Sequence, residues 1–520
     1  MATIVRWKPP LELSPEEQRI AKVLKRIGKF YVFLREVRHE LFDEEFQTEL
    51  AAVYAPRGTD PLPAALLAMV TLLQAYDQTG DADAVVTAQM DLRWQLVLGC
   101  LHVEKAPFSQ GVLSQFRERM IEHDLDKKLL DRTVEIAKRT SRFGWQHLKA
   151  ALDSSPLLGA GRVLDTWSLI GRALSTVVTC AAKATGRDRD SIIAEAQLSL
   201  STAPSLKTAL DIDWDDADQR AEALAQLLDE VDRVETWVTE HASTLANEPP
   251  LRDALVALRR VLEQDLEPDP TIPGRSRIKR GVAKDRMPSL GDPEMRHGRK
   301  TKTKLFNGYK RHVMKVIGTD ITVAAEVLPA NQPEHDAMAP LTDDAERHGP
   351  IAEVLLDRGY LASPRVAELS ARGVTIRCKP WRTGNGGRFT KEQFDIRLDE
   401  QRVICPAGAS AKIADSRIAR FPSATCGPCH LRTQCTTAKH RTVSIHSDEA
   451  LLIQLRRELR RPDGRAALRE RADVEHSLAR LGRIQGPRAR FKGVRKNTLD
   501  ARRCASVDNL QTVARVREAS

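Results

Sequence analysis

The first 140 residues show apolar positions at helical spacing, interrupted by short polar turns. Residues 14–17 have the composition of a helix start, with serine as the cap, proline at the first helical position and acids in the first turn. Residues 62–99 predict a packed helix, a polar turn near Gly80 and a second helix that ends at Gly99. Phe108 opens another helix. Such short helices suit helix-turn-helix DNA binding, but many other helical modules share the pattern.

The pattern changes near residue 147. Residues 147–152 form a short apolar run that stops at Asp153 before turn-forming residues, which predicts a buried strand, with a helix end as the alternative. Residues 167–268 return to long helical patterns, and an irregular basic stretch follows to residue 293. Two strand-like runs, 304–315 and 321–328, are separated by a glycine-containing turn and predict a hairpin.

The alternation of strands and helices continues to residue 378. Residues 336–346 read as a helix, 351–356 as a buried strand that ends at Asp357, 363–371 as a helix and 374–378 as a strand. The order strand, hairpin, helix, strand, helix, strand predicts a mixed sheet with helices packed on it.

Composition and charge narrow the class of protein. The longest apolar stretches are too short to span a bilayer and the N-terminus lacks a signal-peptide core, so we expect a cytoplasmic protein with no membrane partner. The net charge is +10, and basic residues concentrate in 275–315 and 456–517 while acids crowd into 211–267. The two basic stretches are able to form one phosphate-binding surface, although solvated helix faces would give the same pattern.

Asp153 and Asp357 share a local context, because each follows an apolar run and precedes turn formers. Ligands of α/β sheets tend to sit at the carboxyl ends of strands, and two carboxylates there are suited to hold the divalent metals of two-metal phosphodiester cleavage. Magnesium prefers such oxygen ligands. Either aspartate alone could instead be a turn or helix cap, and Asp165 is a rival to Asp153.

Glu475 is the third acidic candidate. It falls at helical spacing with four small or apolar positions, which are Leu468, Ala472, Ala479 and Gly482. Arg471 precedes Glu475 by four residues, close enough on one helix face to keep the carboxylate ionised. A surface ion pair is the alternative interpretation.

These segments together resemble the DDE transposases of bacterial insertion sequences. The likeness rests on residues 62–120, on Leu-Asp-Ser-Ser-Pro at 152–156, on residues 292–312 with Asp-Arg-Gly-Tyr at 357–360, and on Asp-Val-Glu at 473–475 with the basic loop behind it. The resemblance implies an α/β RNase H-like core, formed by a mixed sheet flanked by helices. It also implies an N-terminal all-α domain, here expected to bind the DNA ends, and a core interrupted by a helical insertion and a small cysteine-rich insertion.

The domain division expected from this resemblance has six segments: residues 1–140 as the N-terminal helical domain, 145–170 and 286–380 as the first two parts of the core, 171–285 as the helical insertion and basic linker, 381–455 as the cysteine-rich insertion, and 456–520 as the last part of the core with the glutamate helix and a basic tail.

The resemblance implies a metal-dependent enzyme that cleaves DNA at the terminal inverted repeats of an element and transfers the strands to a target. Asp153, Asp357 and Glu475 are its expected catalytic residues and ligands of two Mg²⁺ or Mn²⁺ ions. Double-stranded DNA is the expected partner, in the nucleoid, and the chain is expected to form a homo-oligomer when it brings two ends together.

The last helix departs from many relatives, because Leu468 stands where they have a tyrosine and Gly482 where they have a lysine. Nearby basic residues are available to replace these DNA contacts electrostatically. The residues expected to bind DNA are Lys300, Lys302, Lys310, Arg471, Arg483, Arg488 and Lys492.

A cysteine cluster completes the candidate chemistry. Cys426 and Cys429 have CxxC spacing, and Cys405 with Cys435 would complete a four-thiolate structural zinc site. Free cysteines are the alternative. Two other functions stay open: a sequence-specific DNA-binding protein derived from a transposase but unable to cut, and a zinc-stabilised RNA-binding protein.

Overall fold

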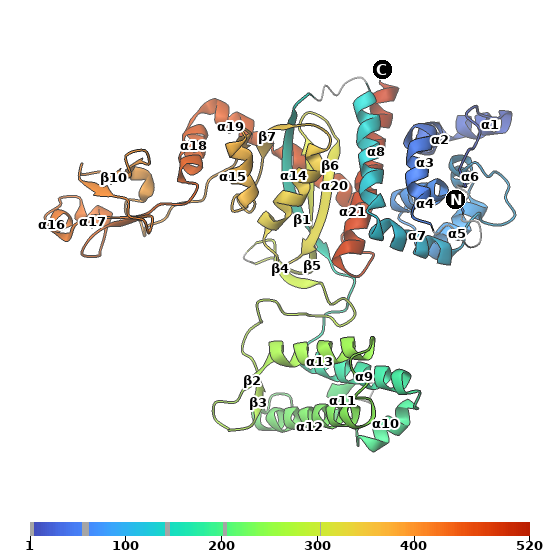
Figure 1. The fold of residues 1–520 in the computed structure, drawn as a ribbon, viewed down its shortest axis with the longest axis horizontal. Helices are drawn as coiled ribbons and strands as arrows, with labels where there is room; N and C mark the ends of the chain where they lie inside the picture. The colour runs from blue at the N-terminus through green and yellow to red at the C-terminus, as the bar shows by residue number, and fades with distance from the viewer. Residues whose placement is uncertain are drawn as a thin grey trace.

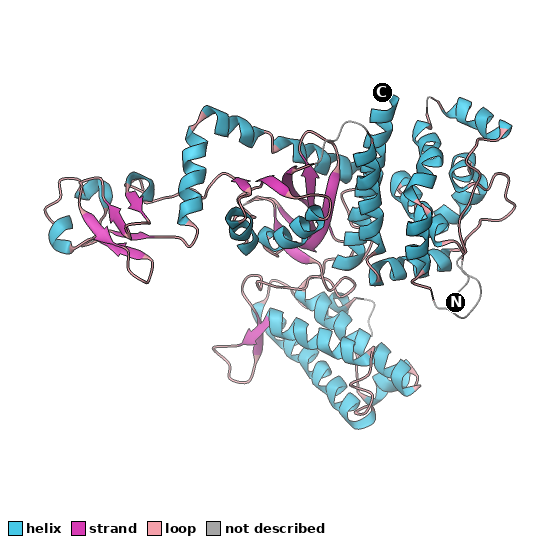
Figure 2. Cartoon of the chain, turned by 45° about the horizontal axis from the view of Figure 1, so that its top comes forward, coloured by secondary structure: helices cyan, strands magenta, loops and turns pink. Residues whose placement is uncertain are grey.

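The computed structural model describes residues 5–25, 27–54, 62–140, 146–200, 205–301 and 303–519. A central sheet lies beside the N-terminal helices, with a helical unit on one side and a cysteine-rich unit at the far end (Figure 1). Figure 2 shows that the long strands belong to the central sheet, whereas the neighbouring unit is almost entirely helical. Within the described ranges, none of the helices has the length and apolar character needed to cross a bilayer.

The N-terminal region is helical, as predicted. Its helices are α1 Pro15–Leu24, α2 Lys29–Leu41, α3 Glu44–Ala51, α4 Ala64–Asp77, α5 Asp81–Met90, α6 Leu92–Leu98, α7 Gln110–Glu122 and α8 Leu125–Arg139. The predicted start at Ser14 is confirmed, because its hydroxyl accepts from the Glu17 N–H (3.1 Å) while the Glu17 carboxylate accepts from the Ser14 N–H (2.8 Å).

The prediction of one helix between Gly80 and Gly99 is wrong, because two short helices stand there. Asp91 interrupts the helical pattern and caps α6 by accepting a hydrogen bond from the Arg93 N–H (2.8 Å). Gly99 ends α6 with a φ of 67°, a left-handed conformation that favours glycine, so the predicted end of the segment is confirmed.

The central sheet mixes antiparallel and parallel strands. Its strands are β1 Leu148–Leu158, β4 Arg296–Arg299, β5 Leu305–Val316, β6 Thr322–Pro329, β7 Ile351–Leu355 and β8 Thr375–Arg377. The strand β5 pairs antiparallel with β1, β4 and β6, and β7 pairs in parallel with both β1 and β8. The predicted hairpin is therefore confirmed as β5 and β6, and the expected mixed sheet is present.

Helices connect and cover the sheet. The segment between β6 and β7 begins as a 3-10 turn, η1 Glu334–Ala337, and continues as α14 Met338–Glu346, while α15 Pro364–Ala371 joins β7 to β8. The later helices are α18 Glu449–Arg460, α19 Pro462–Arg469, α20 Ala472–Gln485 and α21 Val494–Glu518. The long helix α21 packs against α8, α4 and β6, so that N-terminal helices and sheet share one hydrophobic core.

The helical unit follows β1 in the chain and has a hydrophobic core of its own. Its elements are α9 Thr166–Thr185, α10 Arg189–Glu195, α11 Leu206–Leu210, α12 Ala217–His241, α13 Leu251–Asp265, β2 Leu266–Pro268 and β3 Ser276–Ile278. The short strands β2 and β3 form a hairpin in the stretch where the sequence predicted only irregular chain.

The cysteine-rich unit is built from short elements around a third, small core. They are η2 Lys391–Gln393, β9 Asp395–Arg397, β10 Arg402–Ile404, β11 Ser410–Lys412, β12 Ile418–Arg420, α16 Ser423–Cys426, α17 Arg432–Cys435 and β13 Thr442–Ser444. Three of the cysteines pack against its apolar residues.

Candidate active site

The register of the parallel strands β1 and β7 places two acidic residues side by side. Ala151 of β1 pairs with Leu355 of β7, and Asp153 and Asp357 each lie two residues further along the chain. Because neighbouring strands are about 4.8 Å apart, the two aspartates occupy equivalent positions of adjacent chain segments. Asp357 follows the end of β7, as the sequence predicted.

Asp153 does not end its strand, so that prediction is wrong. β1 continues for five more residues to Leu158, since β5 pairs with it as far as Gly308, and Asp153 itself lies opposite Val313. The turn-forming residues after Asp153 are held extended by this cross-strand pairing, which local sequence signals do not contain.

Arg471 joins two of the three candidate acids. Its Nη1 donates to Oδ2 of Asp153 at 3.0 Å, and its Nη2 donates to Oε1 of Glu475 at 3.3 Å. The Asp153 side chain is 17% exposed, whereas that of Glu475 is 58% exposed. The guanidinium therefore contacts both a mostly buried carboxylate of the sheet and an exposed carboxylate of α20.

The single helix predicted across residues 468–482 is wrong. Leu468 belongs to α19, and α20 begins only at Ala472. The corner between the two helices is fastened to β1 by ion pairs, since Glu470 contacts Lys149 at 2.6 Å and Arg471 contacts Asp153. These contacts across the fold favour the break over a continuous helix.

The electrostatics of Asp153 reflect its neighbours. Burial raises the pKa of Asp153, and the negative charges of Asp357 and Glu475 raise it further, against the lowering effects of the Ser154 N–H and of Arg471. The carboxylates of Asp357 and Glu475 thus both lie within electrostatic reach of Asp153. Positive charge placed among them would stabilise their ionised forms.

The residues at this position fit a divalent cation by their chemistry. Carboxylate oxygens are the ligands that Mg²⁺ prefers, and the Arg471 guanidinium already supplies a positive charge between two of them. In the described part of the chain, no three His, Cys, Asp or Glu side chains are gathered closely enough to form a ready-made metal-binding group. The acids would therefore have to turn toward a cation to ligate it together.

A fourth carboxylate, unnoticed in the sequence, lies behind the aspartates. Oε1 of Glu334 accepts a hydrogen bond from the Ser154 hydroxyl at 2.7 Å, next to Asp153. The same carboxylate packs directly on Gly359, where a Cβ would overlap its Oε2. The close approach of Glu334 therefore requires a glycine at the third position of the Asp-Arg-Gly-Tyr motif. This glycine is the sequence signal for the contact between Glu334 and the motif.

Tyr360 and His312 form the buried floor beside these residues. The Tyr360 hydroxyl and Nδ1 of His312 lie 2.6 Å apart, and both side chains are fully buried. Burial lowers the pKa of His312 to about 3 and raises that of Tyr360 well above its usual value, so both groups are neutral at physiological pH. They pack the base of the site with a neutral polar pair rather than an additional charge.

The residues predicted to bind DNA are dispersed. Lys300 is exposed beyond β4, Lys310 donates to the Gln332 carbonyl at 3.1 Å, and Lys302 lies outside the described residues. Arg483 lines a hollow between α20, α21, α2 and α4. Arg488 and Lys492 instead follow α20 toward the end of β1, where Nη1 of Arg488 donates to the Gly159 carbonyl at 3.3 Å.

The four candidate zinc ligands lie around one cavity of about 240 Å³, which Cys405, Cys426, Cys429 and Cys435 line together with His430. None of these cysteines is in a disulfide. Burial raises the pKa of the Cys435 thiol, and the other three thiols raise it further, whereas Arg441 lowers it. The four sulfur atoms are therefore close enough to interact electrostatically.

Asp165, the rival of Asp153, is placed elsewhere. It caps α9 by accepting from the Ser168 N–H at 3.0 Å, and it pairs with Lys207 at 3.0 Å. Its position at the start of the helical unit favours Asp153 as the partner of Asp357.

Comparison with known protein families gave two matches. Residues 22–119 match the model described as Transposase domain (DUF772), and residues 404–514 match the model described as Transposase DDE domain. The second match contains Glu475 and all four clustered cysteines, whereas Asp153 and Asp357 lie outside both. A comparison with curated proteins and one with solved structures gave no match. The two family matches confirm the resemblance in the sequence motifs, because both matched segments are similar to domains of transposases and one of them to a DDE domain.

Proposed function

We propose that this transposase cleaves DNA at the terminal inverted repeats of an insertion sequence and transfers the strands to target DNA, using Asp153, Asp357 and Glu475. The observation that carries the proposal is the convergence of three carboxylates from separate parts of the chain. Register places Asp153 beside Asp357, and Arg471 joins Asp153 to Glu475.

The sheet topology supports an RNase H-like core. The strands run in the order β6, β5, β1, β7, β8, with three antiparallel strands followed by two parallel ones that are reached through helices α14 and α15. The candidate acids stand on the central strand, at the end of its parallel neighbour and on a helix packed against the sheet, which suits a phosphodiester lying across the sheet edge.

The residues of the chain position the reaction. Ser154 donates its N–H to Asp153 Oδ1 at 2.8 Å, and Arg471 holds Asp153 Oδ2, so this carboxylate is fixed at both oxygens. Mg²⁺ or Mn²⁺ bound by the three acids would activate the attacking oxygen and stabilise the leaving one. Arg471 also presents positive charge where a scissile phosphate would lie.

Three accessory features belong to the same proposal. The four cysteines that line the cavity would hold a structural zinc ion once their thiolates turn toward it, and such a four-thiolate site would leave no open position for catalysis. The predicted basic residues bind the DNA backbone. Two chains act together when two DNA ends are joined.

Nicking of DNA that carries the element's ends tests the proposal. In Mg²⁺ or Mn²⁺, Asp357→Asn should lower the cleavage rate by about 10³-fold, because losing a metal ligand removes several kcal/mol of transition-state stabilisation. Asp165→Asn is the matched control and should cut normally. Full cleavage by Asp357→Asn would overturn the assignment of the site, and DNA binding by the unaltered protein with no cleavage in either metal would favour a transposase-derived binding protein.

A further inference from the structure

A basic cleft lies between the helical unit and the sheet. It encloses about 800 Å³. Helices α9 and α11 supply one wall, and the other comes from residues 160–164 after β1, residues 289–291 and Lys492. Among the described lining residues, Lys492 is the one that the sequence predicted to bind DNA, and none of them belongs to the candidate active site.

Its charge is one-sided. None of the described residues that line the cleft is acidic. Lys207 is partly neutralised by Asp165 at 3.0 Å. Arg162, Arg172 and Lys492 are exposed, and within the described ranges no carboxylate pairs with them. Serine and threonine side chains of α9 line the cleft together with these cations, and such hydroxyls commonly bind phosphate oxygens of a DNA backbone.

The core wall of the cleft is held in place by buried contacts. Asp292 is fully buried, accepts a hydrogen bond from the Tyr309 hydroxyl and accepts another from the Gly493 N–H at 3.0 Å, next to Lys492. Gly161 packs so closely that a Cβ would lie 2.6 Å from Cβ of Asp292. The backbone next to Arg162 and next to Lys492 is therefore held in place by the same buried aspartate.

The cleft continues the line of β1 beyond the candidate acids. The strand runs five residues from Asp153 to Leu158, which is about 17 Å at 3.3 Å per residue. Arg162 follows four residues later, so it lies at most about 30 Å from Asp153 even if the chain between them is fully extended. Arg488 bridges the interval by bonding the Gly159 carbonyl. At 3.4 Å per nucleotide, this interval corresponds to about five to nine nucleotides of one DNA strand.

We propose that the cleft binds the sugar-phosphate backbone of one strand of duplex DNA, about five to nine nucleotides from the bond that is cleaved. The inference rests on the proposed function, and it assigns the helical unit a part in holding that DNA. Exposed cations on two walls suit a backbone that lies along the surface, whereas a site for a small free anion would enclose its ligand with buried polar groups.

The salt dependence of DNA binding tests the cleft directly. A duplex of about 40 base pairs with arbitrary sequence is sufficient, because phosphate contacts are independent of sequence. Each lost phosphate contact lowers the magnitude of the slope of log K against log salt by about 0.9, so Arg162→Ala/Arg172→Ala should lower it by about 1.8. If the two proteins bind equally at 1 M salt, this difference in slope corresponds to roughly 30-fold weaker binding by the variant at 0.15 M salt.

Lys183→Ala is the matched control. Lys183 is exposed on the same helix, outside the cleft and about 16 Å from Arg172 at 1.5 Å per residue, so its loss should leave the slope unchanged. Arg162→Lys/Arg172→Lys should restore most of the slope, which distinguishes lost charge from damaged folding. Equal slopes for the double alanine variant, Lys183→Ala and the unaltered protein would overturn the proposal.

Substrate length separates the cleft from the catalytic proposal. Shortening the duplex on either side of the cleaved bond to fewer than about five base pairs should abolish the difference between the double alanine variant and the unaltered protein. A difference that persists on such short duplexes would place the two arginines elsewhere on the DNA. If the unaltered protein does not cut but the binding slopes differ, the catalytic proposal fails and the cleft stands.

Discussion

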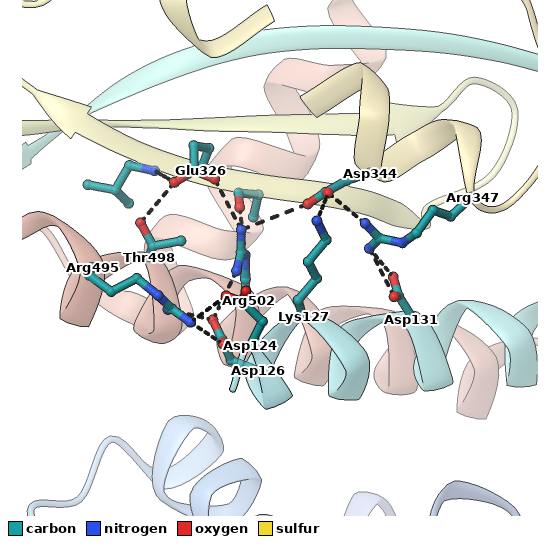
Figure 3. Close-up of polar contacts among 12 residues, drawn as sticks. Asp124, Asp126, Lys127, Asp131, Glu326, Asp344, Arg347, Arg495, Thr498 and Arg502 are labelled. Atoms are coloured by element: carbon teal, nitrogen blue, oxygen red, sulfur yellow. Dashed lines mark hydrogen bonds and ion pairs between the residues drawn. The ribbon is translucent and has the colours of Figure 1, made fainter. Parts of the chain in front are cut away.

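Replacing Asp126 with alanine removes the anion on which two arginines of α21 converge (Figure 3). Arg495 donates to both carboxylate oxygens at 2.9 and 2.6 Å, and Arg502 donates to Oδ2 at 3.2 Å. Asp126 begins α8 and its side chain is fully buried, whereas Arg502 is 7% exposed. The substitution therefore strands positive charge between the N-terminal helices and the long C-terminal helix.

The loss of stability in Asp126→Ala depends on the ion pairs that Arg495 and Arg502 retain. Removing one partner of a buried ion pair costs about 3–5 kcal/mol. In the variant, Arg502 retains its ion pairs with Glu326 at 3.1 Å and Asp344 at 3.8 Å, and Arg495 retains its pair with the exposed Asp124. These remaining pairs place the expected cost near the lower limit of that range. We expect Asp126→Ala to lower the free energy of unfolding by about 3 kcal/mol, which is more than a 100-fold change in the folding equilibrium.

Denaturant unfolding measures this cost, and Glu40→Ala provides the matched control. Glu40 of α2 also pairs with α21, through Arg517 at 2.8 Å, but both side chains are at least a third exposed. Its loss should cost less than about 1 kcal/mol. If Asp126→Ala destabilises no more than Glu40→Ala, the reasoning is wrong. Asp126→Leu combined with Arg502→Leu should be less damaging than Asp126→Ala, because it strands less charge.

Three further outcomes follow from the structure. Gly359→Ala places a Cβ against Glu334 and should lower the cleavage rate at least about tenfold without unfolding the chain, because a forced shift beside the acids misplaces the reacting groups. An unchanged nicking rate would contradict this. Metal analysis should find about one zinc per chain, lost in Cys426→Ser, and no zinc in the unaltered protein would refute the site. Burial alone would raise the pKa of Asp131, but hydrogen bonds with His348 and Arg347 lower the pKa below its ordinary value of 3.8. The stability that Asp131 contributes through these contacts is present above pH 3.8 and is lost as pH falls through the lower folded pKa. The difference in urea midpoint between the unaltered protein and Asp131→Asn should therefore be fully present at pH 6 and should shrink as the pH is lowered below 3.8.

The sequence predicted those elements whose signals are local. The capped start of α1, the β5–β6 hairpin and the strand before Asp357 were correct, because cap chemistry, a glycine turn and a short apolar run each act within a few residues. The length of β1 and the break before α20 were not predicted. Both depend on partners far along the chain, namely β5 and the ion pairs of β1 with Glu470 and Arg471.

The candidate site was predicted in outline only. Asp153, Asp357 and Glu475 were found through their contexts and the family resemblance, and their mutual proximity required the register of β1 with β7. Glu334 escaped notice because it lies in a 3-10 turn with no apolar pattern around it. Its contact with Ser154 crosses 180 positions of sequence, which no local pattern reports.

The burial of α21 bears on how DNA recognition is coupled to cleavage. This helix of 25 residues spans about 37 Å, and its middle is buried between the N-terminal helices and the sheet. Asn509 shows the consequence at one residue, since its amide donates to Thr133 of α8 and to the Thr322 carbonyl of β6. DNA held by the N-terminal helices would therefore lie at a fixed distance from the carboxylates. A loose linker would let the two parts act independently, whereas this packing makes any shift of the N-terminal helices also a shift against the sheet that carries Asp153.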